Sequence, residues 1–255
     1  MSESILGRNR SANDKPTCVL VAGATGGIGS AFCRRLAQTF PGTVLIRLAR
    51  HPARLEKLAT ETHDLTFELG EEAQIEDAVR QIPEHLQLEW AFIATGWLHD
   101  EQHTPEKTYK SLDARHMLHA YHTNAVGPAL LVKHLLPRMQ TTKPAIIGIL
   151  SARVGSISDN RMGGWHAYRA SKAALNMLIK NYALEFARRK HGPIIVGLQP
   201  GTTDTALSAP FQRSVPEDQL QTPEYTAAQL LMVMQHLEPS DSGKLFDFLG
   251  LPFDP

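Results

Sequence analysis

Apolar runs of strand length alternate with stretches of helical period along most of the chain. The predicted strands are 17–22, 43–49, 64–69, 88–95, 144–151, 193–199 and 244–249. The predicted helices lie near 27–39, 52–60, 72–82, 113–138, 165–190 and 223–237. Several strands are continuously apolar and rich in β-branched residues, which is typical of parallel strands covered by helices on both faces.

This alternation predicts a single α/β domain over 15–255, built on a Rossmann-type, doubly wound parallel sheet of about seven strands with helices on both faces. A closed (β/α)8 barrel is the alternative, but it needs eight similar units and the spacings here are unequal. Residues 1–14 are polar and lack the apolar segment of a signal peptide. We therefore expect them to form a disordered tail.

Composition narrows the functional classes. The 255 residues include 26 basic and 26 acidic side chains, and this balance argues against binding to nucleic acid or to a membrane surface. No apolar run approaches the roughly 20 residues that span a bilayer. The two cysteines, Cys18 and Cys33, exclude a disulfide scaffold and a cysteine-rich zinc site. We expect a protein of the reducing cytoplasm.

A glycine-rich turn follows the first predicted strand and leads into a helix. Its residues are Gly23, Ala24, Thr25, Gly26, Gly27, Ile28 and Gly29. Glycines let backbone N–H groups approach a phosphate closely, and the helix N-terminus adds partial positive charge. A tight turn alone could explain the spacing, but the place after the first strand favours a dinucleotide site.

The end of the second strand suggests which dinucleotide is bound. Enzymes that use NAD usually carry a carboxylate there, which holds the ribose 2′-hydroxyl. This chain has Ala49 and Arg50 instead. A guanidinium forms charge-assisted hydrogen bonds with a 2′-phosphate, so Arg50 favours NADP(H) over NAD(H). An exposed arginine without this role is the alternative.

Tyr168 and Lys172 are four residues apart in a strongly helical stretch, so both lie on one helix face. A free phenol has a pKa near 10, and a nearby ammonium stabilises its anion. The pair can therefore act as a general acid–base. Ser151 ends the fifth predicted strand, where ligands meet an open parallel sheet.

These residues, together with Asn124 and Pro200-Gly201, occur in the order of the short-chain dehydrogenase/reductase family, which the chain resembles from about Thr17 onward. The run from Ser151 to Leu178 resembles the branch of C-factor signalling proteins and sniffer-type carbonyl reductases.

The resemblance implies a role for each matching residue. Tyr168 would protonate the substrate carbonyl oxygen, and Ser151 would position that oxygen. Lys172 would hold the nicotinamide ribose and lower the pKa of Tyr168, while Asn124 would bind a water that links Lys172 to solvent. Further cofactor contacts would come from Glu68, Leu69, Ala94, Thr95, Gly96, Pro200, Gly201, Thr203 and Thr205.

The chain departs from the family pattern at three places. Ile93-Ala94-Thr95-Gly96 stands where the family has Asn-Asn-Ala-Gly, and Glu68 stands where an aspartate is usual. Ser151 precedes Tyr168 by a longer interval than usual, so Ser156 and Ser158 are alternatives. We prefer Ser151 because it directly ends the strand, and we interpret the extra residues as a longer loop over the pocket.

Other residues carry weaker signals. Trp97, Leu98, Trp165 and Phe211 could line a substrate pocket or be ordinary packing residues. Residues 206–222 could form a mobile lid. Several of the twelve histidines lie at helical spacing, but no third ligand for a metal accompanies them. Surplus apolar residues on 113–138 and 165–190 predict a homodimer or homotetramer.

Together these features predict an NADPH-dependent oxidoreductase that acts on a small carbonyl substrate, an aldehyde or a ketone. A dinucleotide-binding signalling or sensor protein of the C-factor type, with incidental catalysis, is the alternative.

Overall fold

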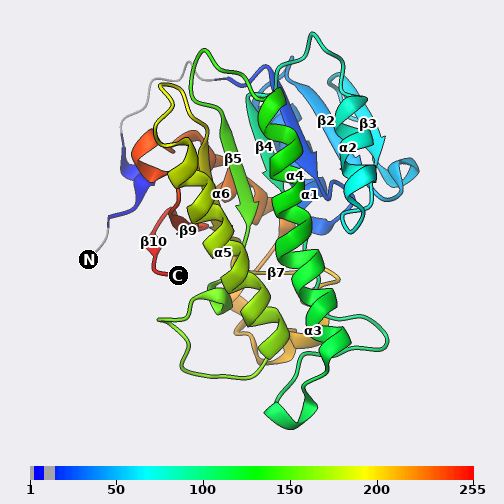
Figure 1. The fold of residues 1–255 in the computed structure, drawn as a ribbon, viewed down its shortest axis with the longest axis vertical. Helices are drawn as coiled ribbons and strands as arrows, with labels where there is room; N and C mark the ends of the chain where they lie inside the picture. The colour runs from blue at the N-terminus through cyan, green and yellow to red at the C-terminus, as the bar shows by residue number, and fades with distance from the viewer. Residues whose placement is uncertain (1–2, 9–14) are drawn as a thin grey trace.

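The computed structural model describes residues 3–8 and 15–255, in which helices cover both faces of an eight-stranded, mostly parallel sheet (Figure 1). The strand order is β10-β9-β6-β5-β4-β1-β2-β3. The strands are β1 (Cys18–Ala22), β2 (Val44–Ala49), β3 (Thr62–Thr66), β4 (Trp90–Ile93), β5 (Ile146–Leu150), β6 (Ile194–Gln199), β9 (Leu245–Asp247) and β10 (Pro252–Phe253). The predicted doubly wound α/β fold is confirmed.

The seven predicted strands are all present, and the structure adds short ones. β10 is the eighth strand of the sheet and the only antiparallel one among the described residues. β7 (Thr202–Thr203) and β8 (Leu220–Gln221) pair with each other outside the main sheet. Two-residue strands leave no hydrophobic periodicity in a sequence, so the pattern analysis could not find them.

Four helices lie where periodicity predicted them: α1 (Gly27–Thr39), α2 (Glu72–Arg80), α5 (His166–Phe186) and α6 (Pro223–Gln235). The helix predicted over 113–138 is interrupted. It consists of α3 (Ala114–Tyr121), a π-helical segment at His122–Val126, α4 (Gly127–Leu135) and a final 3-10 turn. Such π segments widen a helix locally and often occur at functional sites.

The prediction of a helix at 52–60 is wrong. Within that range only Pro52–Arg54 are helical, and they form one 3-10 turn. Arg47, buried in β2, explains the difference. Its guanidinium donates to the Glu56 carbonyl oxygen at 2.8 Å and to the Asp64 carboxylate at 2.7 Å. A buried arginine needs such acceptors, and a helix continuing through Glu56 would use that carbonyl itself.

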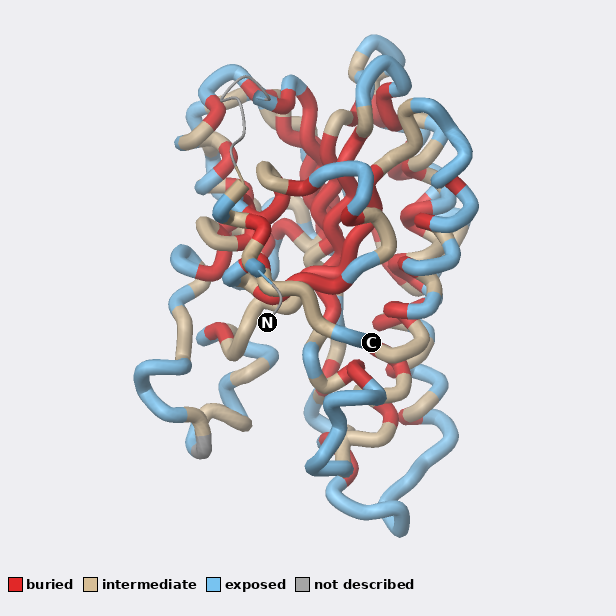
Figure 2. The backbone as a smooth tube through the Cα atoms, turned by 90° about the vertical axis from the view of Figure 1, so that its left-hand side faces the viewer, coloured by how far each residue is buried: buried red, intermediate tan, exposed pale blue. Residues whose placement is uncertain are grey.

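Two apolar layers hold the sheet between its helices, and Figure 2 shows the buried residues gathered along the strands. On one face, α1 and α6 contribute Phe32 and Leu230 to the buried cluster. On the other face, α4 and α5 contribute Leu131 and Ile179, and α2 also packs there. Burial of the sheet on both faces explains why its central strands are continuously apolar.

The order of the strands brings the site residues together. β1 lies between β2 and β4, so the connections leave β1 and β4 in opposite directions across the sheet. Ligands of open α/β sheets bind in the crevice that this reversal leaves beyond the carboxyl ends of the strands. The glycine turn, Thr95 and Ser151 directly follow or nearly follow β1, β4 and β5.

Part of the N-terminal segment is ordered, in contrast to the expected disordered tail. Ile5–Gly7 form a 3-10 turn, and Ile5 is buried against the core. Arg8 donates two hydrogen bonds to the carboxylate of Asp241, whose side chain is fully buried. The ion pair between Arg8 and Asp241 and the burial of Ile5 hold residues 5–8 against the domain. Residues 1–2 and 9–14 of the expected tail lie outside the described residues.

The described residues also bear on the expectations drawn from composition. No helix among them is both long and apolar enough to cross a lipid bilayer. Cys18 and Cys33 are free and buried in β1 and α1, and burial raises the pKa of each thiol to about 12. The cytoplasmic location stays a prediction.

Candidate active site

The glycine turn between β1 and α1 has a backbone that side chains would obstruct. Gly23 has a φ of +80°, and an added Cβ would lie 2.7 Å from the carbonyl oxygen of Ala94. A Cβ at Gly29 would collide with the Gly23 carbonyl oxygen. Residues 25–27 are exposed where α1 begins, and the first N–H groups of the helix have no partner within it. This arrangement suits a phosphate group.

Thr95 supplies independent evidence for a ligand beside this turn. Its Oγ1 is buried without a hydrogen-bond partner among the described residues. Its methyl group lies 3.3 Å from where a Cβ of Gly23 would be, so the hydroxyl belongs to the same corner of the sheet. An unsatisfied buried hydroxyl costs about 1–3 kcal/mol, and a polar ligand group could satisfy it. The corner therefore fits a dinucleotide.

The end of β2 presents Arg50 to solvent. Its side chain has no hydrogen-bond or ion-pair partner among the described residues, so it is available to a ligand. Ala49 pairs with Thr66 of β3, which places Glu68 at the same edge of the sheet. Leu69 is buried against Gly127, so its side chain faces the core.

Asn124 occupies the π-helical segment and is completely buried. Its Oδ1 accepts a hydrogen bond from the Trp97 backbone N–H at 2.7 Å. Its Nδ2 donates to the Trp97 carbonyl oxygen at 2.8 Å and to the Ser171 hydroxyl at 3.0 Å. The amide therefore joins the loop after β4 to α5, and Oδ1 can accept one further hydrogen bond.

Lys172 is buried beside this amide. Its Nζ donates to the Leu150 carbonyl oxygen at 2.9 Å and lies 5.9 Å from the centre of the Tyr168 ring. A Cβ at Gly96 would lie 3.7 Å from both Lys172 Nζ and Asn124 Oδ1, so the three residues are neighbours. Burial lowers the pKa of Lys172 to about 8, because the charged form loses its water.

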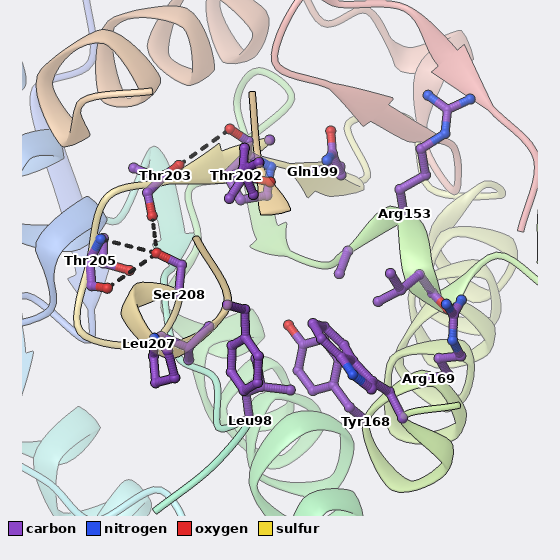
Figure 3. A pocket seen from close by; sticks show the side chains of 18 of the residues that line it. Leu98, Arg153, Tyr168, Arg169, Gln199, Thr202, Thr203, Thr205, Leu207 and Ser208 are labelled. Atoms are coloured by element: carbon purple, nitrogen blue, oxygen red, sulfur yellow. Dashed lines mark hydrogen bonds between the residues drawn. The ribbon is translucent and has the colours of Figure 1, made fainter. Parts of the chain in front are cut away.

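Tyr168 is the third residue of α5, and Figure 3 shows its hydroxyl pointing into the cavity described below. Burial raises the pKa of this phenol to about 12. The hydroxyl therefore stays protonated at neutral pH. The structure brings Tyr168, Lys172 and Asn124 to one place, as their spacing and the resemblance predicted.

Ser151 directly follows β5 and faces the same cavity as Tyr168. Its hydroxyl donates to Asn176 Oδ1 at 2.6 Å, which orients the oxygen lone pairs. The alternative serines lie elsewhere: the Ser156 hydroxyl accepts from the Asp159 N–H, and the Ser158 hydroxyl donates to the Pro255 carbonyl oxygen. Neither lines this cavity, so the geometry favours Ser151.

The segment after β6 forms the wall of the cavity nearest α1. Pro200, Gly201, Thr203 and Thr205 all line the cavity, as does Ile28 of the glycine turn. Thr203 is held by a 2.9 Å hydrogen bond between its hydroxyl and that of Thr226. The methyl group of Thr205 lies 2.6 Å from where a Cβ of Gly27 would be.

A cavity of about 740 Å³ joins these parts. Ser151 and Tyr168 lie in its wall together with Thr205 and Ile28, and residues of the 206–222 segment cover one side (Figure 3). The β7–β8 pairing closes the base of that segment. The volume is in the range of pockets that enclose small molecules.

The four apolar residues whose role the sequence left open, Trp97, Leu98, Trp165 and Phe211, divide into two groups. Leu98, Trp165 and Phe211 line the cavity. Trp97 does not, and it packs its ring edge-to-face against His116 and His119 instead. Among the described residues, no group of three or more histidine, cysteine or acidic side chains is arranged to hold a metal ion.

Two residues near the reacting groups were missed from the sequence. Asn176, one turn beyond Lys172, is the partner of Ser151. Arg169 lines the cavity beside Tyr168. The helical spacing of Asn176 from Lys172 could have suggested the first, but no sequence signal separates Arg169 from a surface arginine.

Comparison with known proteins assigns the chain to a family. The sequence profile of the short chain dehydrogenase family matches residues 17–215. The chain belongs to this family. Members are NAD(P)-dependent oxidoreductases, which confirms the predicted class of enzyme. C-signal of Myxococcus xanthus is 31% identical over 139 residues, which are 54% of this chain and 78% of that protein.

Two solved structures share the fold over nearly their whole length. The NADPH-bound carbonyl reductase from chicken fatty liver has a TM-score of 0.79 and 24% identity, with 94% of each chain covered. Carbonyl reductase Sniffer of Drosophila melanogaster has a TM-score of 0.78 and 20% identity, with 94% of this chain and 99% of that chain covered. These two structures share the fold of this chain, and the similarity to C-signal agrees with the predicted C-factor branch.

The lowered pKa of Lys172 predicts that this residue destabilises the protein at neutral pH. A fall from 10.5 to about 8 corresponds to about 3 kcal/mol, against about 1 kcal/mol for its hydrogen bond to Leu150. We expect Lys172→Met to raise the free energy of unfolding at pH 7 by about 1–2 kcal/mol. The folded pKa is below the unfolded one, so the wild type gains stability as pH rises from about 8 to 10.5, and the difference shrinks.

Urea unfolding at pH 7 and pH 10 measures both effects. The exposed Lys190→Met is the matched control, and we expect it to change little at either pH. A Lys172→Met variant that is less stable than the wild type at pH 7 would contradict the prediction.

Proposed function

We propose that the protein is an NADPH-dependent reductase of small aldehydes or ketones. The observation that carries the proposal is the shared cavity, in which the Tyr168 hydroxyl and Ser151 face the residues next to the glycine turn. A carbonyl compound and the nicotinamide end of a dinucleotide could meet there. The two structural neighbours are carbonyl reductases, one of them bound to NADPH, and they support this choice.

The cofactor would lie along the carboxyl ends of the strands. Its pyrophosphate would contact the free N–H groups at the start of α1, and the Thr95 hydroxyl would gain its missing partner. Arg50 would pair with the 2′-phosphate, and the segment from Pro200 to Thr205 would border the nicotinamide. When bound, the cofactor supplies a hydride.

The protein would supply the proton and the orientation of the substrate. The Ser151 hydroxyl, which donates to Asn176 in this structure, would turn to donate to the substrate oxygen, and Tyr168 would donate a proton to the same oxygen. Burial raises the pKa of Tyr168 to about 12, so its hydroxyl is protonated at neutral pH and has a proton to donate. Lys172 and a water on Asn124 Oδ1 would return the proton to Tyr168.

A dinucleotide-binding signalling protein remains the second candidate, and the similarity to C-signal favours it. Such a protein would bind NADPH but would not need Tyr168. The two functions therefore differ in what a change at this residue does.

Tyr168→Phe removes only the hydroxyl and should reduce kcat by about 10²–10⁴ on the best carbonyl substrate. The fluorescence titration of NADPH should change little, because the ring stays in place. Tyr182→Phe is the matched control on the same helix, since its hydroxyl bonds to the Ala129 carbonyl oxygen away from the cavity. A Tyr168→Phe enzyme that keeps more than about half of the wild-type turnover would refute the proposed role.

Arg50→Ala should weaken the preference for NADPH over NADH. A charged contact with the 2′-phosphate contributes about 1.5–3 kcal/mol, which corresponds to roughly a 10- to 150-fold preference. We expect kcat/KM with NADPH to fall by about that factor while the value with NADH changes little. Ala49→Asp should reverse the preference.

Both cofactors are compared at one ionic strength, because salt screens the contact. Arg54→Ala, a nearby exposed arginine, is the control and should leave the preference unchanged. Equal losses with both cofactors in Arg50→Ala would defeat this explanation.

The expected dimer or tetramer also stays a proposal. Leu118 of α3 is 70% exposed, and Met177 and Leu184 of α5 are 62% and 60% exposed. These helices pack beside each other, so the apolar side chains are candidates for an interface between subunits. Light scattering at micromolar concentration should give a multiple of 28.2 kDa, and Leu118→Lys with Leu184→Lys should reduce it. A monomeric wild type would refute the proposal.

A further inference from the structure

The lining of the cavity is cationic. Lys107, Arg153, Arg169 and Arg213 line it, and none of its lining residues is acidic. They come from four different segments: the loop after β4, the loop after β5, helix α5, and the segment 206–222. Separate segments of the chain thus bring positive charge to one chamber.

Arg169 is the most informative of these residues about the substrate, because it directly follows Tyr168, the proposed proton donor. Its Nε donates to the Gly164 carbonyl oxygen at 3.1 Å and its Nη1 to the Val154 carbonyl oxygen at 3.2 Å. Both acceptors are neutral, and no carboxylate among the described residues pairs with it. Partial burial lowers its pKa, because the charge loses water without gaining an opposite charge. The guanidinium has further N–H donors to offer.

The other three cations differ in how far the protein neutralises them. Arg153 pairs with Asp159 at 2.6 Å. Lys107 and Arg213 are exposed and have no ion-pair partner among the described residues. Charge in excess of local balance therefore remains in the cavity, although the whole chain has none.

The contacts proposed for the cofactor do not account for this charge. Its proposed contacts are on the side of Ile28 and Thr205. Figure 3 shows Thr203, Thr205 and Ser208 on one side of the cavity, Arg153 and Arg169 on the other, and the Tyr168 hydroxyl between them. Arg169 therefore lies on the side of the cavity that the proposed cofactor contacts leave open.

We infer that the carbonyl substrate carries a negatively charged group, with a carboxylate as the simplest case, which Arg169 binds while the carbonyl faces Tyr168 and Ser151. The inference rests on the proposed reductase function and adds a substrate class to it. A guanidinium recognises a carboxylate through charge-assisted hydrogen bonds, which are stronger in a partly desolvated cavity than in water.

Matched acid and ester substrates test the inference. The purified protein is assayed with NADPH and 3- or 4-carboxybenzaldehyde, and in parallel with the methyl esters of the same compounds. We expect the acid with the better-fitting geometry to have a kcat/KM about tenfold higher than its ester at low salt, with the ratio falling as salt rises. Arg169→Gln should reduce the acid-to-ester ratio about tenfold, since glutamine keeps a donor for the nearby carbonyls but loses the charge.

Two further variants keep the test decisive. Arg213→Gln changes an exposed side chain on the cavity wall and should reduce the ratio by a smaller factor even if Arg169→Gln does not fold. Arg188→Gln, beyond the far end of α5, is the matched control and should leave the ratio unchanged. Equal kcat/KM values for acids and esters in the wild type, or a ratio that neither Arg169→Gln nor Arg213→Gln lowers, would overturn the inference.

Binding of the alcohol products separates this inference from the reductase function. In calorimetry with NADP present, the carboxybenzyl alcohol should bind about tenfold more tightly than its methyl ester. If no aldehyde is turned over, the proposed reductase function is contradicted. The ratio of the two product affinities would still show whether the cavity prefers a negatively charged group. If the acid and its ester are both turned over and their alcohol products bind equally tightly, only the charge preference is overturned.

Discussion

The buried amide of Asn124 holds the candidate site in one arrangement. Its three hydrogen bonds fasten the loop after β4 and helix α5 to the π-helical segment. The widened turn places the amide against Gly96 and Lys172. An unpaired amide would be costly at this depth, so the three elements keep their relative positions together. The placement of Tyr168 depends on this anchorage, because α5 carries it.

Desolvation dominates the electrostatics of the cavity. Lys172 and Arg169 both lie on α5 and both lose water without gaining a carboxylate among the described residues. Tyr168 keeps its proton for the same reason. Burial of these charged groups lowers the stability of the ligand-free protein. A bound ligand could supply the missing ion-pair or hydrogen-bond partner, so the groups that lower stability are the ones available for activity. The balanced charge of the chain conceals this local excess.

Sequence reasoning succeeded where an element carries its own signal. The apolar central strands and α1 (Gly27–Thr39) followed from periodicity, with bounds that differ by two residues or fewer at most ends. It failed where a distant group decides the local structure. The chain at 52–60 is irregular because the buried Arg47 takes the Glu56 carbonyl oxygen. Residues 5–8 pack on the domain because Arg8 pairs with the buried carboxylate of Asp241.

The same division holds for the site. The sequence by itself determined the glycine turn, the Tyr168–Lys172 spacing and the strand end at Ser151, because each depends on neighbouring residues and on the regular geometry of a strand or helix. Only the tertiary structure decided that Asn176 orients Ser151 and that Arg169 faces the cavity without a counter-charge. Burial and charge pairing depend on segments far apart in the chain, and no local pattern records which of them meet.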